Sequence, residues 1–200
     1  MPPAETTAPA PTPALPVPLT RFIGRERELT ELTRLLASSR LLTLTGAGGS
    51  GKTRLARETA AGSEAGYEMV VWADLAPLVD PHLVPQPVAV GLGQVERPGQ
   101  STAELVRTAI GTRRTLLILD NCEHLVDACA GFVESLLTSC PELVVLATSR
   151  EALGVPGETA WLVPPLARPE AVQLFVERAQ AVLPSFALTP ANLPAIEEIC

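Results

Sequence analysis

The sequence predicts an α/β protein in which a five-stranded, mainly parallel sheet carries helices on both faces and is followed by the start of a helical lid. Short apolar runs alternate with segments of helical periodicity along most of the 200 residues, which is the pattern of a doubly wound sheet. One of these runs leads directly into a glycine-rich loop. Another ends in an aspartate.

Length and composition set limits on the domain organisation and on the partners. Two hundred residues support one full domain and part of another. We expect a disordered leader rich in proline and alanine over residues 1–19, an α/β domain over 20–165, and the truncated beginning of a helical lid over 166–200. The net charge of −7 makes direct nucleic-acid binding by this segment unfavourable, because a nucleic-acid backbone needs a basic surface.

The sequence contains no signal for a membrane or for export. No apolar run approaches the length that spans a bilayer, and the N-terminus lacks the basic and apolar regions of a signal peptide. The four cysteines are not spaced as in a zinc site. Because Cys129 and Cys140 fall on the apolar side of a predicted helix, we expect reduced, buried thiols and a cytoplasmic protein.

The glycine-rich loop matches the phosphate-binding pattern G-x-x-x-x-G-K-[ST] at every position. Its glycines let backbone N–H groups turn inward, and the N-terminus of the next helix adds partial positive charge. A chance glycine-rich turn is the alternative, but a β-rich run over 41–45 precedes the loop and a helical pattern over 53–61 follows it. The loop residues are Gly46, Ala47, Gly48, Gly49, Ser50, Gly51, Lys52 and Thr53.

Two side chains of the loop carry most of its expected chemistry. Lys52 would contact the β- and γ-phosphates of a nucleotide, and the Thr53 hydroxyl would ligate Mg²⁺. Lys52 is the only lysine among 15 basic residues, and it occupies the position where a flexible ammonium is preferred to a rigid guanidinium. An anionic nucleotide needs local positive charge in an acidic chain. The candidates for it are Lys52, Arg54, Arg25 and Arg150.

Periodicity and capping residues predict the other elements of the first half. An amphipathic helix is expected over 25–39, where leucines recur at helical spacing. A strand over 69–75 is apolar throughout, so we expect both of its faces to be buried. A helix should start at about residue 86 after two prolines that disturb its first turn, and another at Ser101, where Ser101 and Glu104 form a capping box.

A third strand, over residues 115–120, ends in the carboxylate of Asp120. Apolar residues running into an aspartate have the Walker B form, and ligands bind at the carboxyl ends of strands in an open parallel sheet. Asp120 would then hold Mg²⁺, directly or through a water. The alternative is a helix-capping aspartate, since residues 123–139 are helical. The phosphate loop upstream favours Mg²⁺.

The remaining segments complete the sheet and begin the lid. Strands are expected over 143–149 and 161–163. Arg150 follows the first of these and could reach a γ-phosphate or remain a solvated loop cation. A second lid helix starts near residues 189–192 and runs to the end of the chain, which predicts a fragment of a longer protein. The first lid helix opens at Pro169, and its expected apolar face consists of Ala171, Leu174, Phe175, Ala179 and Val182.

Five motifs in order carry a resemblance that covers about residues 20–200. Over this range the chain resembles the NB-ARC-like nucleotide-binding domain of STAND ATPases, a P-loop NTPase fold, and especially the bacterial transcription regulators of the AfsR and LuxR-type large ATP-binding class. The motifs are Phe22-Ile23-Gly24-Arg25-Glu26, the phosphate loop, Asp120-Asn121-Cys122-Glu123-His124, Ala147-Thr148-Ser149-Arg150, and Pro164-Pro165-Leu166 with the helix over 170–175.

The resemblance implies a role for each motif and a strand order. Residues 46–53 would bind the phosphates, with Arg54 beside them at the nucleotide, Asp120 would serve Mg²⁺, and Arg150 would be the sensor arginine that distinguishes ATP from ADP. The fourth strand would lie between the first and the third, which brings Arg150 beside Lys52. The residues that would border the adenine and the ribose are Ile23, Gly24 and Arg25.

The resemblance predicts a signalling switch operated by ATP and ADP, with slow Mg²⁺-dependent hydrolysis, inside a transcription regulator. Hydrolysis should be slow because position 121 is asparagine where many relatives carry a second acid, which leaves only Glu123 as a candidate base. A winged-helix domain, helical repeats and a helix-turn-helix effector are expected C-terminally, with ATP-dependent self-association. Two alternatives stay open: a metabolic NTPase or kinase with fast turnover, and a module in which nucleotide is a structural prop.

Overall fold

The computed structural model of the protein describes residue 15, residues 19–95 and residues 99–200. Within these ranges the strands are β1 (Leu41–Thr45), β2 (Met69–Asp74), β3 (Thr115–Asp120), β4 (Leu143–Thr148) and β5 (Thr159–Leu162). The helices are α1 (Glu26–Leu36), α2 (Lys52–Ser63), α3 (Pro85–Gly91), α4 (Thr102–Ile110), α5 (Val126–Ser139), α6 (Arg168–Val182) and α7 (Leu193–Ile199). The predicted leader falls almost entirely outside the described residues.

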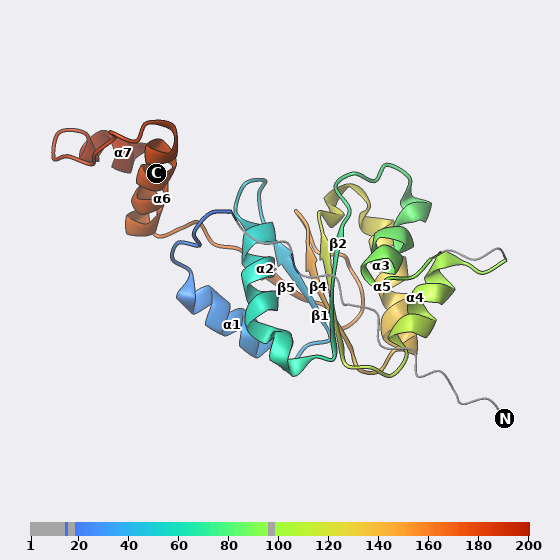
Figure 1. Ribbon diagram of the computed structural model, residues 1–200. Helices are drawn as coiled ribbons and strands as arrows, with labels where there is room; N and C mark the ends of the chain where they lie inside the picture. The colour runs from blue at the N-terminus through green and yellow to red at the C-terminus, as the bar shows by residue number, and fades with distance from the viewer. Residues whose placement is uncertain (1–14, 16–18, 96–98) are drawn as a thin grey trace, which may run out of the picture.

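The described strands form one five-stranded sheet in the order β2-β3-β4-β1-β5, and every pairing is parallel. The helices α1 and α2 cover one face of it, and α3, α4 and α5 cover the other (Figure 1). This confirms the predicted α/β class and the P-loop NTPase architecture. Within the described residues, no helix is both long and apolar enough to cross a membrane.

Each face of the sheet has its own apolar cluster. Leu32 of α1 and Leu55 of α2 pack with Leu44 and Ile118 on one face. Val88 of α3 and the aliphatic side chains of α4 and α5 pack on the other. Cys129 and Cys140 are buried in this second cluster as free thiols, as the sequence predicts. The sheet is therefore shielded on both faces, and the ends of its strands are left to carry polar groups.

The position of β4 decides what gathers at the carboxyl edge of the sheet. Residues of β4 pair with β3 on one side and with β1 on the other, as the family resemblance implied. The ends of β1, β3 and β4 are thus adjacent, although the phosphate loop and Asp120 lie far apart in the sequence. The loop follows β1, Asp120 is the last residue of β3, and Arg150 lies two residues after the end of β4.

Several predicted boundaries and burial patterns were wrong in detail. In β2, Met69 and Trp72 are only half-buried and Asp74 is exposed, because β2 is an edge strand with a neighbour on one side only. The helix α3 starts at Pro85, since proline is tolerated in a first turn. A short 3-10 helix, Cys122–His124, precedes α5, which starts only at Val126.

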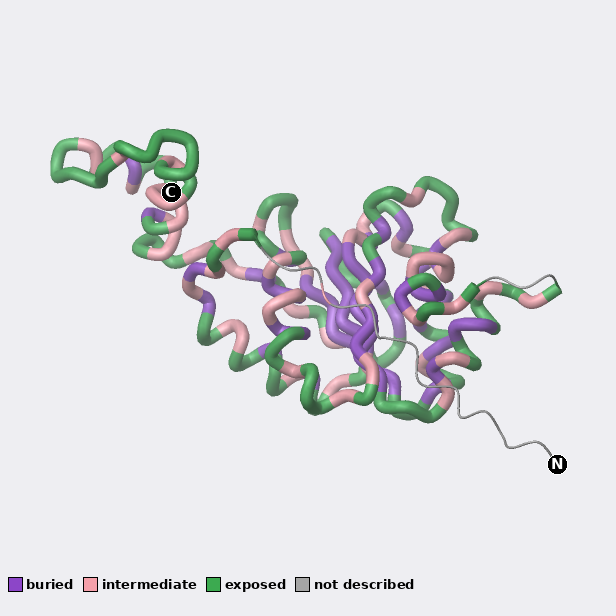
Figure 2. Tube along the Cα trace, in the orientation of Figure 1, coloured by how far each residue is buried: buried purple, intermediate pink, exposed green. Residues whose placement is uncertain are grey.

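The helices α6 and α7 project to one side of the α/β body (Figure 1). Their surface is mostly exposed or half-buried (Figure 2), and among the described residues of these helices only Val172 and Ile196 are buried. The expected apolar face of α6 is therefore not buried, and its Val182 is 88% exposed. A helix that contacts few other elements cannot bury a whole face.

Candidate nucleotide-binding site

The phosphate loop joins the end of β1 to the start of α2. Gly49 and Gly51 have φ angles of 77° and 89°, a left-handed conformation that glycine adopts without steric cost. Gly51 is also the N-cap of α2, so the last residues of the loop present backbone N–H groups at a helix N-terminus. The strand, loop and helix that the motif requires are all present.

The Lys52 side chain folds back over the loop. Its Nζ donates to the carbonyl oxygens of Gly46 at 2.9 Å and Ala47 at 3.0 Å, and the residue is only 8% exposed. Within the described part of the chain, no carboxylate forms an ion pair with it. A buried ammonium held only by loop carbonyls can exchange them for phosphate oxygens, which bind a cation more strongly.

The Thr53 hydroxyl and the Asp120 carboxylate meet at the carboxyl edge of the sheet. Thr53 Oγ1 donates to Asp120 Oδ1 at 2.8 Å. A hydroxyl and a carboxylate side by side are a ligand pair that Mg²⁺ accepts, usually together with waters and phosphate oxygens. The helix-capping alternative for Asp120 was wrong, because Asn121 and Leu125 occupy the N-cap positions of the 3-10 helix and of α5.

Two further residues orient the Asp120 carboxylate. Thr148, the last residue of β4, donates to Asp120 Oδ1 at 2.6 Å, and Asn121 Nδ2 donates to Oδ2 at 3.3 Å. Asn121 has a φ of 64°, and its Nδ2 also lies 3.0 Å from Asp74 Oδ1. Burial raises the pKa of the Asp120 carboxyl above its usual value, while the hydrogen bonds from Thr148 and Thr53 oppose the rise.

Arg150 follows β4 and faces both the phosphate loop and the segment after Asp120. Its Nη2 would lie 3.9 Å from a Cβ built on Gly48, and its Nε lies 3.6 Å from Glu123 Oε1. The Arg150 side chain is 68% exposed, so it can move. The sequence did not predict its ion pair with Glu123, whose other carboxylate oxygen is buried without a hydrogen-bond partner.

Arg25 joins the segment before α1 to the loop and to the end of the sheet. The residue is 6% exposed, and its Nη2 donates to the carbonyl oxygens of Ser50 and Pro164, each at 3.0 Å. Its Nη1 is buried without a partner, and so is Ser50 Oγ. A polar ligand beside the loop could satisfy both of these atoms.

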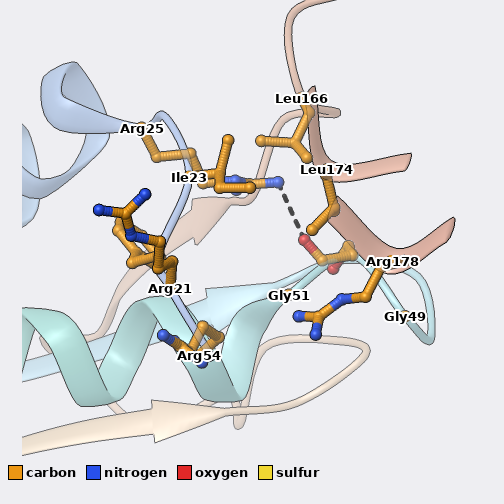
Figure 3. Close-up of a pocket in the computed structure, with 11 residues that line it drawn as sticks. Arg21, Ile23, Arg25, Gly49, Gly51, Arg54, Leu166, Leu174 and Arg178 are labelled. Carbon is orange, nitrogen blue, oxygen red and sulfur yellow. Dashed lines mark hydrogen bonds between the residues drawn. The ribbon is translucent and has the colours of Figure 1, made fainter. Parts of the chain in front are cut away.

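A cavity of about 200 Å³ lies beside the loop, between the segment before α1 and the helix α6 (Figure 3). Ile23 and Arg25, which were predicted to border the adenine and the ribose, line this cavity, and their contact with a nucleotide stays a prediction. Gly24 does not line it, because it packs against Glu170, whose side chain a Cβ at position 24 would overlap. Loop residues and Arg54 also line the cavity. The sequence did not predict the remaining lining residues, which are Arg21, Phe22, Leu166, Leu174 and Arg178.

Arg54 lies at the same cavity, but its partners are protein groups. Its Nε forms an ion pair with Glu58 at 2.9 Å, and its guanidinium donates to the hydroxyl and the carbonyl oxygen of Thr20. It also lies over the Phe22 ring, 5.7 Å from the centroid. The expected contact between Arg54 and the nucleotide remains a prediction.

A comparison with known families places the chain in one of them. The family described as Novel STAND NTPase 1 matches residues 19–154, which include the phosphate loop, Asp120 and Arg150. The chain belongs to this family of STAND NTPases. The match agrees with the resemblance to STAND ATPases inferred from the motifs.

Two relatives in Mycobacterium tuberculosis contain a similar segment within longer chains. One, whose name describes a candidate HTH-type transcriptional regulator, is 48% identical over 167 residues, which cover 83% of this chain and 19% of that protein. The other, an uncharacterized protein, is 44% identical over 186 residues, covering 91% of this chain and 47% of that protein. The chain therefore spans about a fifth of the first relative and about half of the second.

Solved structures show the same fold at lower identity. The STAND protein with a tetratricopeptide repeat sensor from Pyrococcus horikoshii superposes with a TM-score of 0.55 at 21% identity, covering 89% of this chain and 27% of that chain. DnaA from Aquifex aeolicus, solved with AMPPCP bound, superposes with a TM-score of 0.54 at 15% identity, covering 90% and 59%. At these identities the likeness shows the fold alone.

Proposed function

We propose that this chain is an ATP- and ADP-binding switch of a cytoplasmic transcription regulator and that it hydrolyses ATP slowly with Mg²⁺. One observation carries the proposal: the Thr53 hydroxyl lies 2.8 Å from the Asp120 carboxylate, beside a loop over which Lys52 is folded. Membership of the STAND NTPase family supports nucleotide binding. The name of the Mycobacterium tuberculosis relative supports a role in transcription.

Each residue of the site has a defined task in this proposal. The loop N–H groups and Lys52 bind the phosphates, and Thr53 and Asp120 hold Mg²⁺. When bound, Mg²⁺ offsets the negative charge that develops on the transferred phosphoryl group. Thr148 and Asn121 keep the Asp120 carboxylate in place through the hydrogen bonds described above.

Slow hydrolysis follows from the residues beside Asp120. Asn121 carries an amide, which cannot accept the proton of an attacking water as a general base does. Glu123 is already engaged by Arg150, whose Nε lies 3.6 Å from Glu123 Oε1, so it is not free to orient an attacking water. A slowly hydrolysed nucleotide keeps the bound state long enough to report a signal.

The switch itself is assigned to Arg150. Because the Arg150 side chain is exposed and borders the loop at Gly48, its guanidinium can exchange Glu123 for a γ-phosphate. A ligand shifts an equilibrium only by its differential affinity for the two states, and a contact made with ATP but not with ADP supplies that difference. In the longer protein we expect a winged-helix domain, helical repeats and a helix-turn-helix effector to receive the change, with ATP-dependent self-association.

The experiment measures nucleotide content, thermal stability and turnover of the purified chain beside Lys52→Ala and Lys52→Arg. The wild type should bind ATP and ADP and turn over well below about one per second, whereas ordinary enzymes run near ten per second. A nucleotide at one hundred times its Kd should stabilise the chain by about 2.7 kcal/mol. Lys52→Ala should lose this stabilisation, and Lys52→Arg should retain part of it.

Other outcomes would point to the competing functions. Fast multiple turnover would favour a metabolic NTPase. Tight binding with no hydrolysis at all would favour a structural nucleotide. Arg150→Ala should reduce the preference between ATP and ADP, while Arg113→Ala, an exposed arginine remote from the strands' carboxyl ends, should leave it unchanged. If the ratio of ATP affinity to ADP affinity is the same in the wild type, Arg150→Ala and Arg113→Ala, Arg150 is not the sensor.

A further inference from the structure

The cavity beside the loop carries more positive charge than the base and ribose of a nucleotide require. Its described lining includes four arginines and no acidic residue, in a chain whose net charge is −7. Gly49, Ser50 and Gly51 of the loop line it on one side, whereas Lys52, Thr53 and Asp120, the side chains assigned to the β- and γ-phosphates and to Mg²⁺, do not. The four arginines are Arg21, Arg25, Arg54 and Arg178.

Two of these guanidinium groups converge on one neutral oxygen. Arg54 Nη1 donates to Thr20 Oγ1 at 3.0 Å, and Arg178 Nη2 donates to the same oxygen at 3.2 Å. They come from different helices, α2 and α6, and only Arg54 has an ion pair among the described residues, with Glu58. Like charges this close repel one another, whereas an anion between them would turn the repulsion into attraction.

Arg25 adds a buried donor to the same cavity. Its Nη2 is occupied by the carbonyl oxygens of Ser50 and Pro164, while its Nη1 is buried without a hydrogen-bond partner. A guanidinium that is 6% exposed and has no carboxylate partner in the described chain is costly unless a ligand satisfies it. Figure 3 shows its side chain and that of Arg178 reaching the cavity from opposite sides.

The chemistry of these groups selects a phosphate. Guanidinium forks bind phosphate oxygens in pairs. The base and the ribose are neutral, and the loop with Lys52 already serves the 5′ phosphates. We propose that the cavity is a second phosphate-binding subsite, which receives a phosphate group in addition to those of the 5′ chain. This rests on the proposed function, because the nucleotide's ribose must enter the same cavity.

Two sources can supply this group. A phosphate esterified to the 2′ or 3′ oxygen of the ribose and a free orthophosphate ion present the same oxygens to the arginines. The first would make the site selective for a nucleotide that carries a ribose phosphate. The second would make nucleotide affinity depend on the phosphate concentration. In both cases Arg178 links the ligand to α6, so occupancy would also hold α6 against the loop.

The experiment measures displacement of a fluorescent ADP analogue by AMP, by adenosine 2′,5′-bisphosphate, by adenosine 3′,5′-bisphosphate, and by AMP with orthophosphate. The proteins are the wild type, Arg178→Ala and Arg168→Ala, which removes an exposed arginine of α6 outside the cavity. In the wild type one bisphosphate, or AMP with orthophosphate, should compete about tenfold more tightly than AMP alone. Arg178→Ala should abolish that advantage without weakening AMP, and Arg168→Ala should retain it.

Either of two results would overturn the subsite. The first is that AMP, both bisphosphates, and AMP with orthophosphate compete equally with wild-type protein. The second is that Arg178→Ala weakens AMP as much as the bisphosphates, which would show that Arg178 contacts an ordinary part of the nucleotide. Binding of the fluorescent ADP analogue itself reports on the proposed function, so the subsite can fail while that function stands.

Discussion

The carboxyl edge of the sheet and the helical pair α6–α7 use their side chains in opposite ways. At the edge, Asp120 is 2% exposed and accepts hydrogen bonds from Thr53, Thr148 and Asn121. In the helical pair, most side chains are exposed or half-buried (Figure 2). The edge is thus held by a buried core and a hydrogen-bonded network, while the pair is held by a few contacts at one end.

Three of the described contacts lie beside the candidate nucleotide-binding site. Arg25 donates to Pro164, just before α6, Glu170 packs against Gly24, and Arg178 donates to Thr20. A segment joined to a rigid body by contacts beside a ligand site opens at low cost and can respond to the ligand. The difference between the two regions therefore suggests which one stays fixed and which one moves.

The largest expected effect compares two buried isoleucines. Ile118→Ala, in the centre of β3, should lower the free energy of unfolding by about 2–5 kcal/mol, because it opens a cavity in the core. Ile196→Ala, in α7, should shift the main urea transition far less, since α6–α7 can unfold locally before it. Equal shifts would show that the two regions unfold as one unit.

A smaller effect tests the joint between the regions. Arg25→Met keeps the aliphatic stem but removes the hydrogen bonds to Ser50 and Pro164. This loss should lower stability by at most about 1–3 kcal/mol, because the substitution also removes a buried charge that has no carboxylate partner among the described residues. Limited proteolysis should also cut faster between β5 and α6. The control is Arg27→Met, on the exposed surface of α1. If both variants are cut at the wild-type rate, Arg25 does not hold the joint.

The smallest effect tests the buried carboxylate through its pH dependence. Because burial raises the pKa of Asp120 in the folded state, its ionisation destabilises the fold, and the wild type loses stability as the pH rises through that pKa. Asp120→Asn lacks this loss. Without nucleotide or Mg²⁺, the stability of the variant relative to the wild type should therefore increase from about pH 4 to pH 7.

Melting temperatures of the two proteins over this pH range provide the measurement. Their difference cancels the titration of the other groups. A difference that stays constant with pH would mean that Asp120 is not desolvated as its burial indicates. The same variant should lose the Mg²⁺ dependence of nucleotide binding, which links this test to the proposed function.

Sequence patterns predicted the elements well where one local signal dominated. The strand over 115–120 has the bounds that its apolar run indicated. Ser101 accepts a hydrogen bond from the Glu104 amide at the start of α4, which is one of the two hydrogen bonds of the predicted capping box. The 3-10 helix at Cys122–His124 was missed, because the turn there depends on the left-handed backbone of Asn121. Hydrophobic periodicity does not report such a conformation.

Burial was predicted less well than secondary structure. The apolar spacing of α6 indicated a buried face, yet the buried residue of that helix is Val172. The half-burial of β2 likewise reflects its place at the edge of the sheet. A pattern shows which residues could be buried together, but neighbouring elements determine whether they are.

The sequence by itself determined the phosphate loop and the strand ends on which the site is built, because glycine freedom, apolar runs and helix starts act over a few neighbouring residues. Only the tertiary structure decided that Thr148 meets Asp120, that Arg150 faces Glu123, and that Arg178 shares a hydroxyl with Arg54. The donor and acceptor in the Arg178–Thr20 bond are 158 residues apart. Contacts at such separation depend on strand order and helix packing, which no local pattern encodes.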